Sequence, residues 1–399
     1  MNKKVIMISM LTLWSMGEKK GAPSFYFTLK KYIDEGFDVT LISPNDSSIK
    51  KYFNNDFRVI TIDLKYKKYN NIKKIGWLFK VLQAKHFINH AYKIAKKFAD
   101  KDCIIYGYEV QGIMAAKKVA YKANASLITR YQGTIVTTDE AMNYKLSDKI
   151  KKYPHLQALR VKSDICIMTN DGTFGLDVLK NIGNKTEKIF FWRNGIDFAK
   201  DKEKIYDYTS KKKKFRFLTI SRVVKWKRID RAIYLIKTLN DKGYNCELKI
   251  VGDGNEKENL IKLVNEYRIN EKVSFLGAIP HEQVYSVMQE ADFFISFYDI
   301  SNLGNPLFEA MYMGLPIITL NTGDTTSIAK NGNNAIVLEV NDLYKNEYKV
   351  EEYLNDYLKS IQIGKNGRMY AMENFYSWEE RMNMEIKCVK ENISGKKIV

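Results

Sequence analysis

The chain has 399 residues, more than one ordinary hydrophobic core organises, which favours two domains of about 150 to 200 residues each. Hydrophobic residues make up 45% and charged residues 28% of the sequence, a composition that excludes a disordered chain. The net charge of +19 suits an anionic partner such as nucleic acid, acidic lipid or a phosphorylated substrate. Abundant Lys, Asn, Ile and Tyr are also typical of AT-rich genomes, so part of this basicity has no functional meaning.

The cysteines and the first segment indicate a reducing compartment. No CxxC pair and no His at metal-ligand spacing accompany the four cysteines, which are Cys103, Cys166, Cys246 and Cys388. Residues 1–14 begin like a signal peptide but reach residues 17–20, GEKK, without a small-residue cleavage site, so we interpret them as a buried strand. No apolar stretch approaches the ~18 residues of a membrane span. We therefore expect a cytoplasmic protein, or one peripheral to the inner face of the cell membrane.

Strand-like apolar runs alternate with helix-like segments through the first half. The runs are residues 5–10, 39–43, 59–64, 103–108, 126–129 and 165–169. This alternation is typical of βαβ units and a parallel sheet. The polar stretch 200–214 follows and ends in consecutive lysines, which makes it the expected linker.

The alternation restarts after the linker. The second set of runs is residues 215–220, 246–251, 273–276, 293–297 and 316–320, with a helix expected from about Ile229. We expect a second doubly wound domain here. The amphipathic tail 377–393 follows the last of these runs.

A basic loop, residues 221–228 with the sequence SRVVKWKR, follows the strand expected at 217–220. It opens a helix, and a helix N-terminus is already electropositive, so a diphosphate would be held well there. A solvated basic loop is the alternative, and charge alone favours it.

A second loop, residues 299–316, follows the strand expected at 293–297 and also opens a helix. Asn305 can cap this helix, Pro306 suits its first turn, and Gly304 lets the backbone approach a ligand closely. Glu309 lies about one turn further on, where a carboxylate can accept hydrogen bonds from two ribose hydroxyls. Alternatively, Glu309 complements the helix end, an effect of about 0.3–1 kcal/mol.

The first half contains a weaker signal, the glycine-containing loop 17–24, in which Pro23 suits the first turn of the next helix. It has neither GxGxxG nor the Gly-Lys-Ser of a P-loop. Dinucleotide binding and NTP hydrolysis are therefore disfavoured.

These segments resemble the family-four retaining glycosyltransferases of GT-B fold, the glycosyl transferases group 1, over nearly the whole chain. Ser221-Arg222 with Lys227 resembles the family's diphosphate clamp, residues 251–254 its VGDG loop, and residues 275–277 its FLG segment beside the nucleobase. Residues 305–316 resemble the stretch that ends in GLPV, and Gly21-Ala22, residues 194–197 and residues 376–378 also fit. No single motif is specific, but their order and spacing together are.

The resemblance implies an α/β fold of two Rossmann-like domains whose parallel sheets face each other across a cleft. Residues 1–198 would form an acceptor-binding domain, residues 199–375 a nucleotide-sugar-binding domain, and residues 376–399 a helix that crosses back to the first domain. Catalytic roles fall to Arg222, Lys227 and Glu309. The implied donor-binding residues are Gly21, Gln132, Gly252, Gly277, Ala278, Ser301, Asn302, Leu303, Gly304 and Asn305.

The sequence departs from the family at two positions. The family's EX7E pair places a glutamate where this chain has Ser301, and that carboxylate helps to hold the donor sugar's hydroxyls. Asp299 lies two residues away, and such a shift moves a carboxylate by several ångströms. The family's His-Gly after the strand at 127–130 is Gln132-Gly133 here; Gln132 can hydrogen-bond a sugar hydroxyl but cannot carry positive charge.

The implied reaction is a hexosyl or related transfer from a nucleotide-sugar, with UDP as the expected carrier, to a glycan or lipid-linked acceptor of bacterial surface polysaccharide or glycoconjugate synthesis. In the family, the acceptor attacks on the face that the diphosphate leaves, and the leaving phosphate takes its proton. Arg222 and Lys227 would stabilise the developing charge. We expect no cofactor and no metal, because no Asp-x-Asp or His cluster lies in a cleft loop.

The segment 64–98 is both basic and aromatic, which suits an anionic membrane that carries a lipid-linked glycan. An ordinary helix with lysine stems along its surface is the alternative. The residues in question are Lys65, Lys67, Lys68, Lys73, Lys74, Trp77, Phe79, Lys80, Phe87, Lys93, Lys96 and Lys97.

Two other function classes compete with an active enzyme. A catalytically silent GT-B protein, acting as a binding subunit or chaperone of a partner transferase, would explain Ser301 and Gln132, whereas the presence of Arg222, Lys227 and Glu309 opposes it. A nucleic-acid-binding protein rests on charge alone. Because no binding module is recognisable, we expect no nucleic-acid partner.

Overall fold

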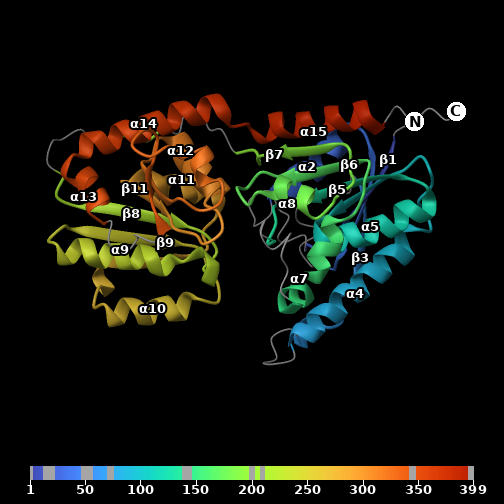
Figure 1. Cartoon of the computed structure of the whole chain (residues 1–399), viewed down its shortest axis with the longest axis horizontal. Coiled ribbons are helices and arrows are strands. Elements are labelled where there is room, and N and C mark those ends of the chain that lie inside the picture. The colour runs from blue at the N-terminus through green and yellow to red at the C-terminus, as the bar shows by residue number, and fades with distance from the viewer. Residues whose placement is uncertain are drawn as a thin grey trace. The chain divides into compact units, whose positions relative to one another are not determined.

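The computed structural model describes residues 3–11, 23–45, 57–69, 76–136, 146–196, 203–206, 212–340 and 347–393 (Figure 1). The chain forms two compact units. The first comprises Met1–Asn170, Phe174–Asn194 and Trp378–Val399, and the second comprises Asp171–Thr173 and Gly195–Ser377. In the part of the chain that the structure describes, no helix combines the length and apolar content needed to cross a membrane.

The first unit is built on a parallel sheet with the strand order β3-β2-β1-β4-β5-β6-β7 among the described residues. The strands are β1 (Lys4–Ser9), β2 (Asp38–Pro44), β3 (Arg58–Ile62), β4 (Ile104–Tyr108), β5 (Ser126–Tyr131), β6 (Ile165–Thr169) and β7 (Ile189–Trp192). The helices are α2 (Pro23–Asp34), α4 (Gly76–Ala95), α5 (Glu109–Ala123), α7 (Leu146–Leu159), α8 (Gly175–Asn181) and α15 (Trp378–Ile393).

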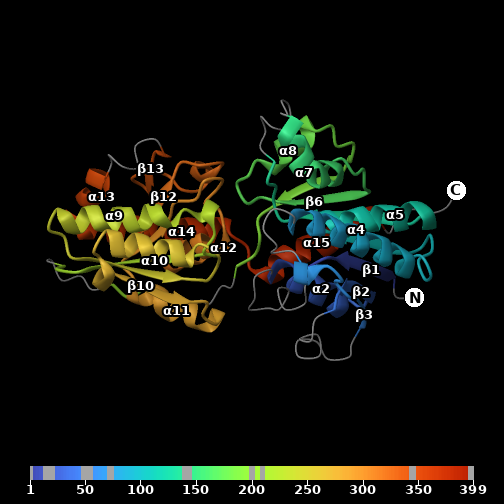
Figure 2. The same cartoon turned by 90° about the horizontal axis from the view of Figure 1, so that it is seen from below.

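Helices cover both faces of this sheet, so its central strands β4 and β5 are buried along their whole length. One layer of the core joins the sheet to α4, α5, α7 and α8, and the other joins it to α2 and α15 (Figure 2). Helix α15 therefore completes the core of the first unit although it follows the second unit in the chain.

The second unit repeats the design with the parallel strand order β10-β9-β8-β11-β12-β13 in its described residues. The strands are β8 (Phe215–Ile220), β9 (Cys246–Val251), β10 (Val273–Gly277), β11 (Phe293–Ser296), β12 (Ile317–Leu320) and β13 (Ile336–Leu338). The helices are α9 (Ile229–Asp241), α10 (Lys257–Glu266), α11 (His281–Glu290), α12 (Asn305–Met313), α13 (Glu347–Asn355) and α14 (Tyr357–Asn374). Helices α9, α10 and α13 pack on one face, and α11 and α12 pack on the other.

The structure confirms the prediction of two Rossmann-like units with parallel sheets. Two short strands, β7 and β13, were not expected from the sequence. All four residues of β7 are only half-buried, and β13 has three residues, so neither gives a strong period-two or continuous apolar signal.

The boundaries differ by a few residues from those expected at 198/199 and 375/376. Gly195 and Ile196 belong to the second unit because Ile196 donates its backbone N–H to the carbonyl of Tyr376 at 3.0 Å and pairs with Ser377. Most of the expected linker, residues 200–214, lies outside the described residues.

A buried ion cluster fixes α15 to the first sheet. Glu385 of α15 accepts hydrogen bonds from Arg130 Nη1 at 2.7 Å, from Arg381 Nη1 at 3.2 Å and from the Tyr106 hydroxyl at 2.8 Å. Arg130, Arg381 and Glu385 are all 0% exposed. One carboxylate is therefore shared by two guanidinium groups inside the core.

Candidate active site

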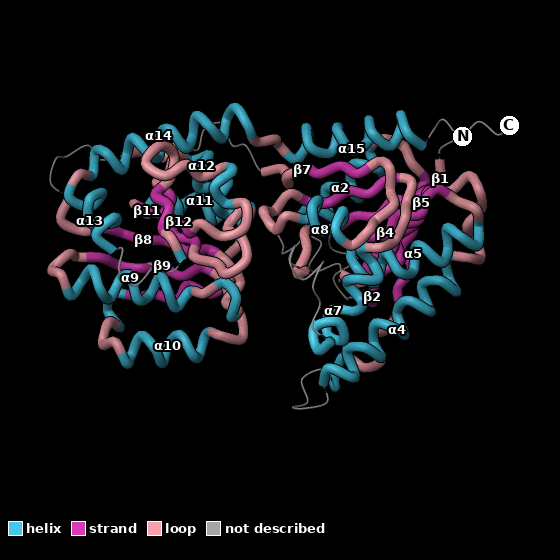
Figure 3. Tube along the Cα trace, in the orientation of Figure 1, coloured by secondary structure: helices cyan, strands magenta, loops and turns pink. Residues whose placement is uncertain are grey.

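The strand order of the second unit locates its ligand-binding edge. Strand β8 pairs with β9 on one side and with β11 on the other, so the chain reverses its direction of travel across the sheet between β8 and β11. In open parallel sheets, ligands bind beyond the carboxyl ends of the strands at such a reversal. The basic loop 221–228 follows β8, and the loop 299–304 follows β11 (Figure 3).

Two glycines let the loops after β8 and β9 come into contact. A Cβ atom on Gly252, whose φ is +127°, would lie 1.8 Å from the carbonyl oxygen of Ser221, and one on Gly254 would lie 2.2 Å from that of Val223. Gly252 also donates its N–H to the carbonyl of Gly277 at 2.8 Å. The structure therefore brings predicted site residues Gly252 and Gly277 together beside the basic loop.

The side of Gly277 that faces away from this contact is open. Its φ is +69°, and a Cβ atom built there would meet nothing within 4 Å. The next residue, Ala278, is exposed. The segment can thus accept a flat group against its backbone.

Lys227 is the last residue of a 3₁₀ turn, Lys225–Lys227. Its ammonium lies against two aromatic rings. Its Nζ lies 3.5 Å from the ring centre of Tyr298 and 4.1 Å from that of Trp226. Burial, together with the positive charge of Arg222 nearby, lowers the pKa of Lys227 to about 7. Arg222 itself is exposed. The two predicted catalytic cations are therefore close enough to interact, and a bound anion would reduce the repulsion between them.

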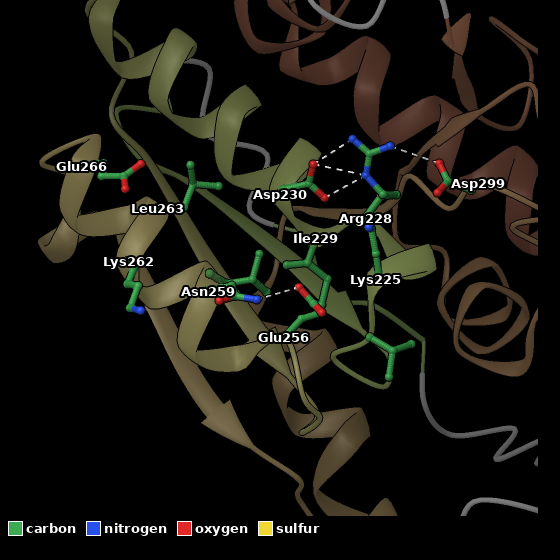
Figure 4. A pocket seen from close by; sticks show the side chains of 12 residues that line it. Lys225, Arg228, Ile229, Asp230, Glu256, Asn259, Lys262, Leu263, Glu266 and Asp299 are labelled. Carbon is green, nitrogen blue, oxygen red and sulfur yellow. Dashed lines mark hydrogen bonds and ion pairs between the residues drawn. The ribbon is translucent and has the colours of Figure 1, made fainter. Parts of the chain in front are cut away.

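Asp299, two residues before position 301, forms ion pairs with two arginines. Its carboxylate pairs with Arg231 at 2.9 Å. It also pairs with Arg228 at 3.2 Å, and Arg228 pairs with Asp230 at 2.8 Å (Figure 4). Asp299, Arg228 and Asp230 line a surface pocket between α9 and α10, which Figure 4 shows. Val224, Lys225 and Arg228 of the basic loop line this pocket, whereas Lys227, Arg222 and Glu309 do not.

Buried side chains fix the shape of the loop after β11. Asn302, 1% exposed, accepts the N–H of Tyr298 and donates to Thr322 Oγ1 at 2.7 Å, while Leu303, 3% exposed, joins the core. Ser301 is 7% exposed and holds the N–H of Leu303 at 3.2 Å. The side chains of Asn302 and Leu303 therefore shape the loop, and a ligand would meet its backbone.

The predicted cap of α12 is corrected by the structure. Asn305 is the first helical residue and donates its side-chain amide to the carbonyl of Gly195 at 3.3 Å, while Gly304 occupies the cap position. Glycine has no side chain, so no side-chain cap bonds the first amides of α12. This helix end is suited to an anion.

Glu309 lies in the second turn of α12 and is 6% exposed. Its Oε1 lies 3.3 Å from Nε2 of His281, the first residue of α11. The sequence analysis did not identify His281. This residue lies at the end of the loop between β10 and α11, so the rule that ligands bind at loops following parallel strands could have found it.

Gln132, the predicted site residue of the first unit, follows β5. Its N–H donates to Glu109 at 2.6 Å, and its Oε1 lies 3.4 Å from the side-chain nitrogen of Asn194. Beyond the carboxyl ends of β5, β6 and β7, several buried polar atoms have no hydrogen-bond partner among the described residues; they are Gln132 Nε2, Thr169 Oγ1, Asn170 Oδ1, Arg193 Nε and Asn194 Oδ1. This edge is thus a second polar site. Gly21 lies outside the described residues.

Known proteins resemble this chain in sequence and in fold. Residues 200–370 match the family described as Glycosyl transferases group 1. The capsular polysaccharide biosynthesis glycosyltransferase CapM of Staphylococcus aureus is 29% identical over 217 residues, 50% of this chain and 54% of CapM. The chain spans about half the length of the curated relatives it matches first.

Two solved structures share the fold over nearly the whole chain. Sucrose-phosphate synthase from Thermosynechococcus elongatus has a TM-score of 0.79 at 15% identity and covers 99% of this chain and 100% of its own. HepE from Anabaena, solved with UDP and glucose, has a TM-score of 0.72 at 14% identity, with 98% and 100% covered. The chain therefore has the GT-B fold, and its residues 200–370 are similar to the Glycosyl transferases group 1 family.

Proposed function

We propose that this chain is a retaining, metal-independent glycosyltransferase that moves a hexosyl or related group from a nucleotide-sugar to a glycan or lipid-linked acceptor. The observation that carries the proposal is the position of Lys227 and Arg222 in the loop after β8. The neighbouring strand, β11, is followed by the loop that leads into α12, and the strand order reverses between these two strands. Two cations and a helix N-terminus without a side-chain cap form a site for a diphosphate.

The nucleoside part of the donor fits the neighbouring residues. Glu309 presents a carboxylate near the start of α12, suited to ribose hydroxyls, and the open side of Gly277 suits a planar base. HepE, which shares the fold, was solved with UDP and glucose, which supports UDP as the carrier. CapM is named for capsular polysaccharide biosynthesis, which supports a role in bacterial surface polysaccharide synthesis.

The proposed reaction requires no protein nucleophile. The bond between the sugar's anomeric carbon and the diphosphate oxygen breaks while the acceptor oxygen bonds to the same carbon on the same face. The acceptor's proton passes to the leaving phosphate. Lys227 and Arg222 stabilise the negative charge that develops on the diphosphate, and the protein contributes positioning and electrostatics.

The proposal is tested by calorimetric titration with UDP, GDP and a panel of their sugar conjugates at pH 7.0 and pH 8.5. Free Lys227, with a pKa of about 7, loses its charge as the pH rises, whereas a bound diphosphate favours the charged form. Binding above pH 7 therefore takes up a proton, and we expect the affinity to fall by up to about tenfold per pH unit.

Lys227→Arg is the matched control, because a guanidinium stays charged over this range and should flatten the pH profile. A wild-type protein that binds no nucleotide or nucleotide-sugar at either pH would refute the proposal. Binding of a donor without any turnover would instead favour a catalytically silent binding subunit.

We further propose that α4 rests on an anionic membrane at the inner face of the cell membrane. Trp77, Leu78 and Leu82, in its first two turns, are 64%, 43% and 36% exposed, and Lys80 and Lys85 beside them are exposed. Exposed aromatic and aliphatic side chains among lysines are typical of interfacial helices. Phe87, expected on this surface, is instead part of the core, and Lys73 and Lys74 lie outside the described residues.

Replacing Trp77 and Leu82 by serine is expected to abolish flotation with vesicles that contain anionic lipid, because the apolar insertion is lost. Wild-type flotation should also be lost at high salt, which screens the lysines. Leu358→Ser is the control, since Leu358 is 55% exposed on α14. No wild-type flotation at low salt, or equal loss in the control, would contradict the proposal.

A further inference from the structure

The short segment Asp171–Thr173 follows β6 in the chain but belongs to the second unit. The hydroxyl of Ser301 donates to the main-chain carbonyl of Asp171 at 2.6 Å, and the N–H of Asp324 donates to that of Gly172 at 2.9 Å. These bonds hold the segment against the loops after β11 and β12, at the edge where the donor is proposed to bind.

Gly172 of this segment packs tightly against Ser301 and Gly323. A Cβ atom on Gly172 would lie 2.2 Å from Ser301 Oγ, and one on Gly323 would lie 2.3 Å from the carbonyl oxygen of Gly172. A side chain at position 172 would therefore collide with Ser301. Gly172 therefore lets this segment approach the Ser301 hydroxyl that bonds to Asp171.

Asp171 brings a carboxylate to this place. One of its oxygens accepts hydrogen bonds from Thr173, from the N–H at 3.2 Å and from the hydroxyl at 2.6 Å. The side chain is partly exposed, and it interacts electrostatically with Lys227. Burial raises the pKa of Asp171 to about 6, and Lys227 opposes that shift, so the carboxylate is charged at neutral pH.

Asp299, the acidic side chain nearest to Ser301 in the sequence, does not serve this purpose. Its carboxylate is held by Arg228 and Arg231. Asp171, whose main chain is bonded by Ser301, instead offers a carboxylate that interacts with Lys227.

Building on the proposed function, we propose that Asp171 binds the sugar of the donor. Its carboxylate accepts a hydrogen bond from a hydroxyl of the transferred sugar, beside the Lys227 ammonium that holds the diphosphate. In this proposal the Ser301 hydroxyl does not contact the sugar. It instead holds the main chain of Asp171 in place.

The test compares Asp171→Asn and Asp171→Ala with wild type by titration with UDP and with the nucleotide-sugar that wild type binds best. We expect affinity for the nucleotide-sugar to fall about tenfold or more, because a hydrogen bond to a charged group is lost. Affinity for UDP should stay the same or rise, because a negative charge near the diphosphate is removed. This opposite response separates a sugar contact from a general disturbance of the site.

Asp177→Asn is the matched control. Asp177 lies on α8, and its side chain is 54% exposed, so both affinities should match wild type. If Asp171→Asn behaves like this control, the sugar contact is refuted and the proposed function stands. If it weakens UDP and the nucleotide-sugar equally, Asp171 is structural and the inference is wrong. If wild type binds no nucleotide-sugar, the proposed function fails together with the inference.

Discussion

Lys227→Ala is expected to lower kcat by about 100- to 1,000-fold with the donor that the protein binds. In the proposed reaction, negative charge grows on the diphosphate as its bond to the sugar breaks, and removing one preorganised charge-stabilising group costs about this factor. The environment of Lys227 strengthens the effect, because its Nζ sits 3.5 Å from the ring centre of Tyr298, in a site where water is partly excluded.

The measurement is turnover of nucleotide-sugar, followed as release of nucleoside diphosphate. Lys225→Ala is the control, because Lys225 belongs to the same 3₁₀ turn and carries the same charge on an exposed side chain. We expect its kcat to remain within about twofold of wild type, because exposed charges interact weakly through water. Equal activity in the two variants would show that Lys227 does not stabilise the leaving group.

Glu385→Gln is expected to destabilise the first unit by about 3–5 kcal/mol, the usual cost of leaving a buried charge without its partner. The substitution keeps the shape of the side chain but removes the negative charge between Arg130 and Arg381. Both guanidinium groups, 0% exposed, would then face each other in the core with no anion. Because α15 provides this carboxylate, its docking on the sheet should weaken as well.

The free energy of unfolding is to be measured by urea denaturation followed by circular dichroism. Glu391→Gln on the same helix is the control, since Glu391 is 59% exposed and lies 4.0 Å from Lys387. An exposed pair of this kind contributes about 0.3–0.5 kcal/mol. A loss in Glu385→Gln no greater than in the control would mean that the buried cluster does not hold α15 to the sheet.

The fold could be predicted from the sequence because its information is local. Strands buried on both faces appear as short continuous apolar runs, and helices of suitable length separate them, so the two parallel sheets follow from alternation alone. The candidate site of the second unit was also found this way. Each loop that follows a strand lies at the same edge of the sheet, which places the loops carrying Lys227, Gly252, Gly277 and Gly304 together.

The tertiary structure decided what depends on contacts between distant segments. Glu385 and Arg130 are 255 residues apart, and only packing of α15 on the first sheet makes them a buried pair. Asp171 comes from the loop after β6, yet its neighbour Ser301 lies 130 residues further along the chain. Periodicity and motif spacing describe each element by itself, whereas burial and charge pairing arise when elements pack. The sequence therefore determined the two sheets and most of the candidate donor-site loops, and packing alone brought Asp171 to Ser301.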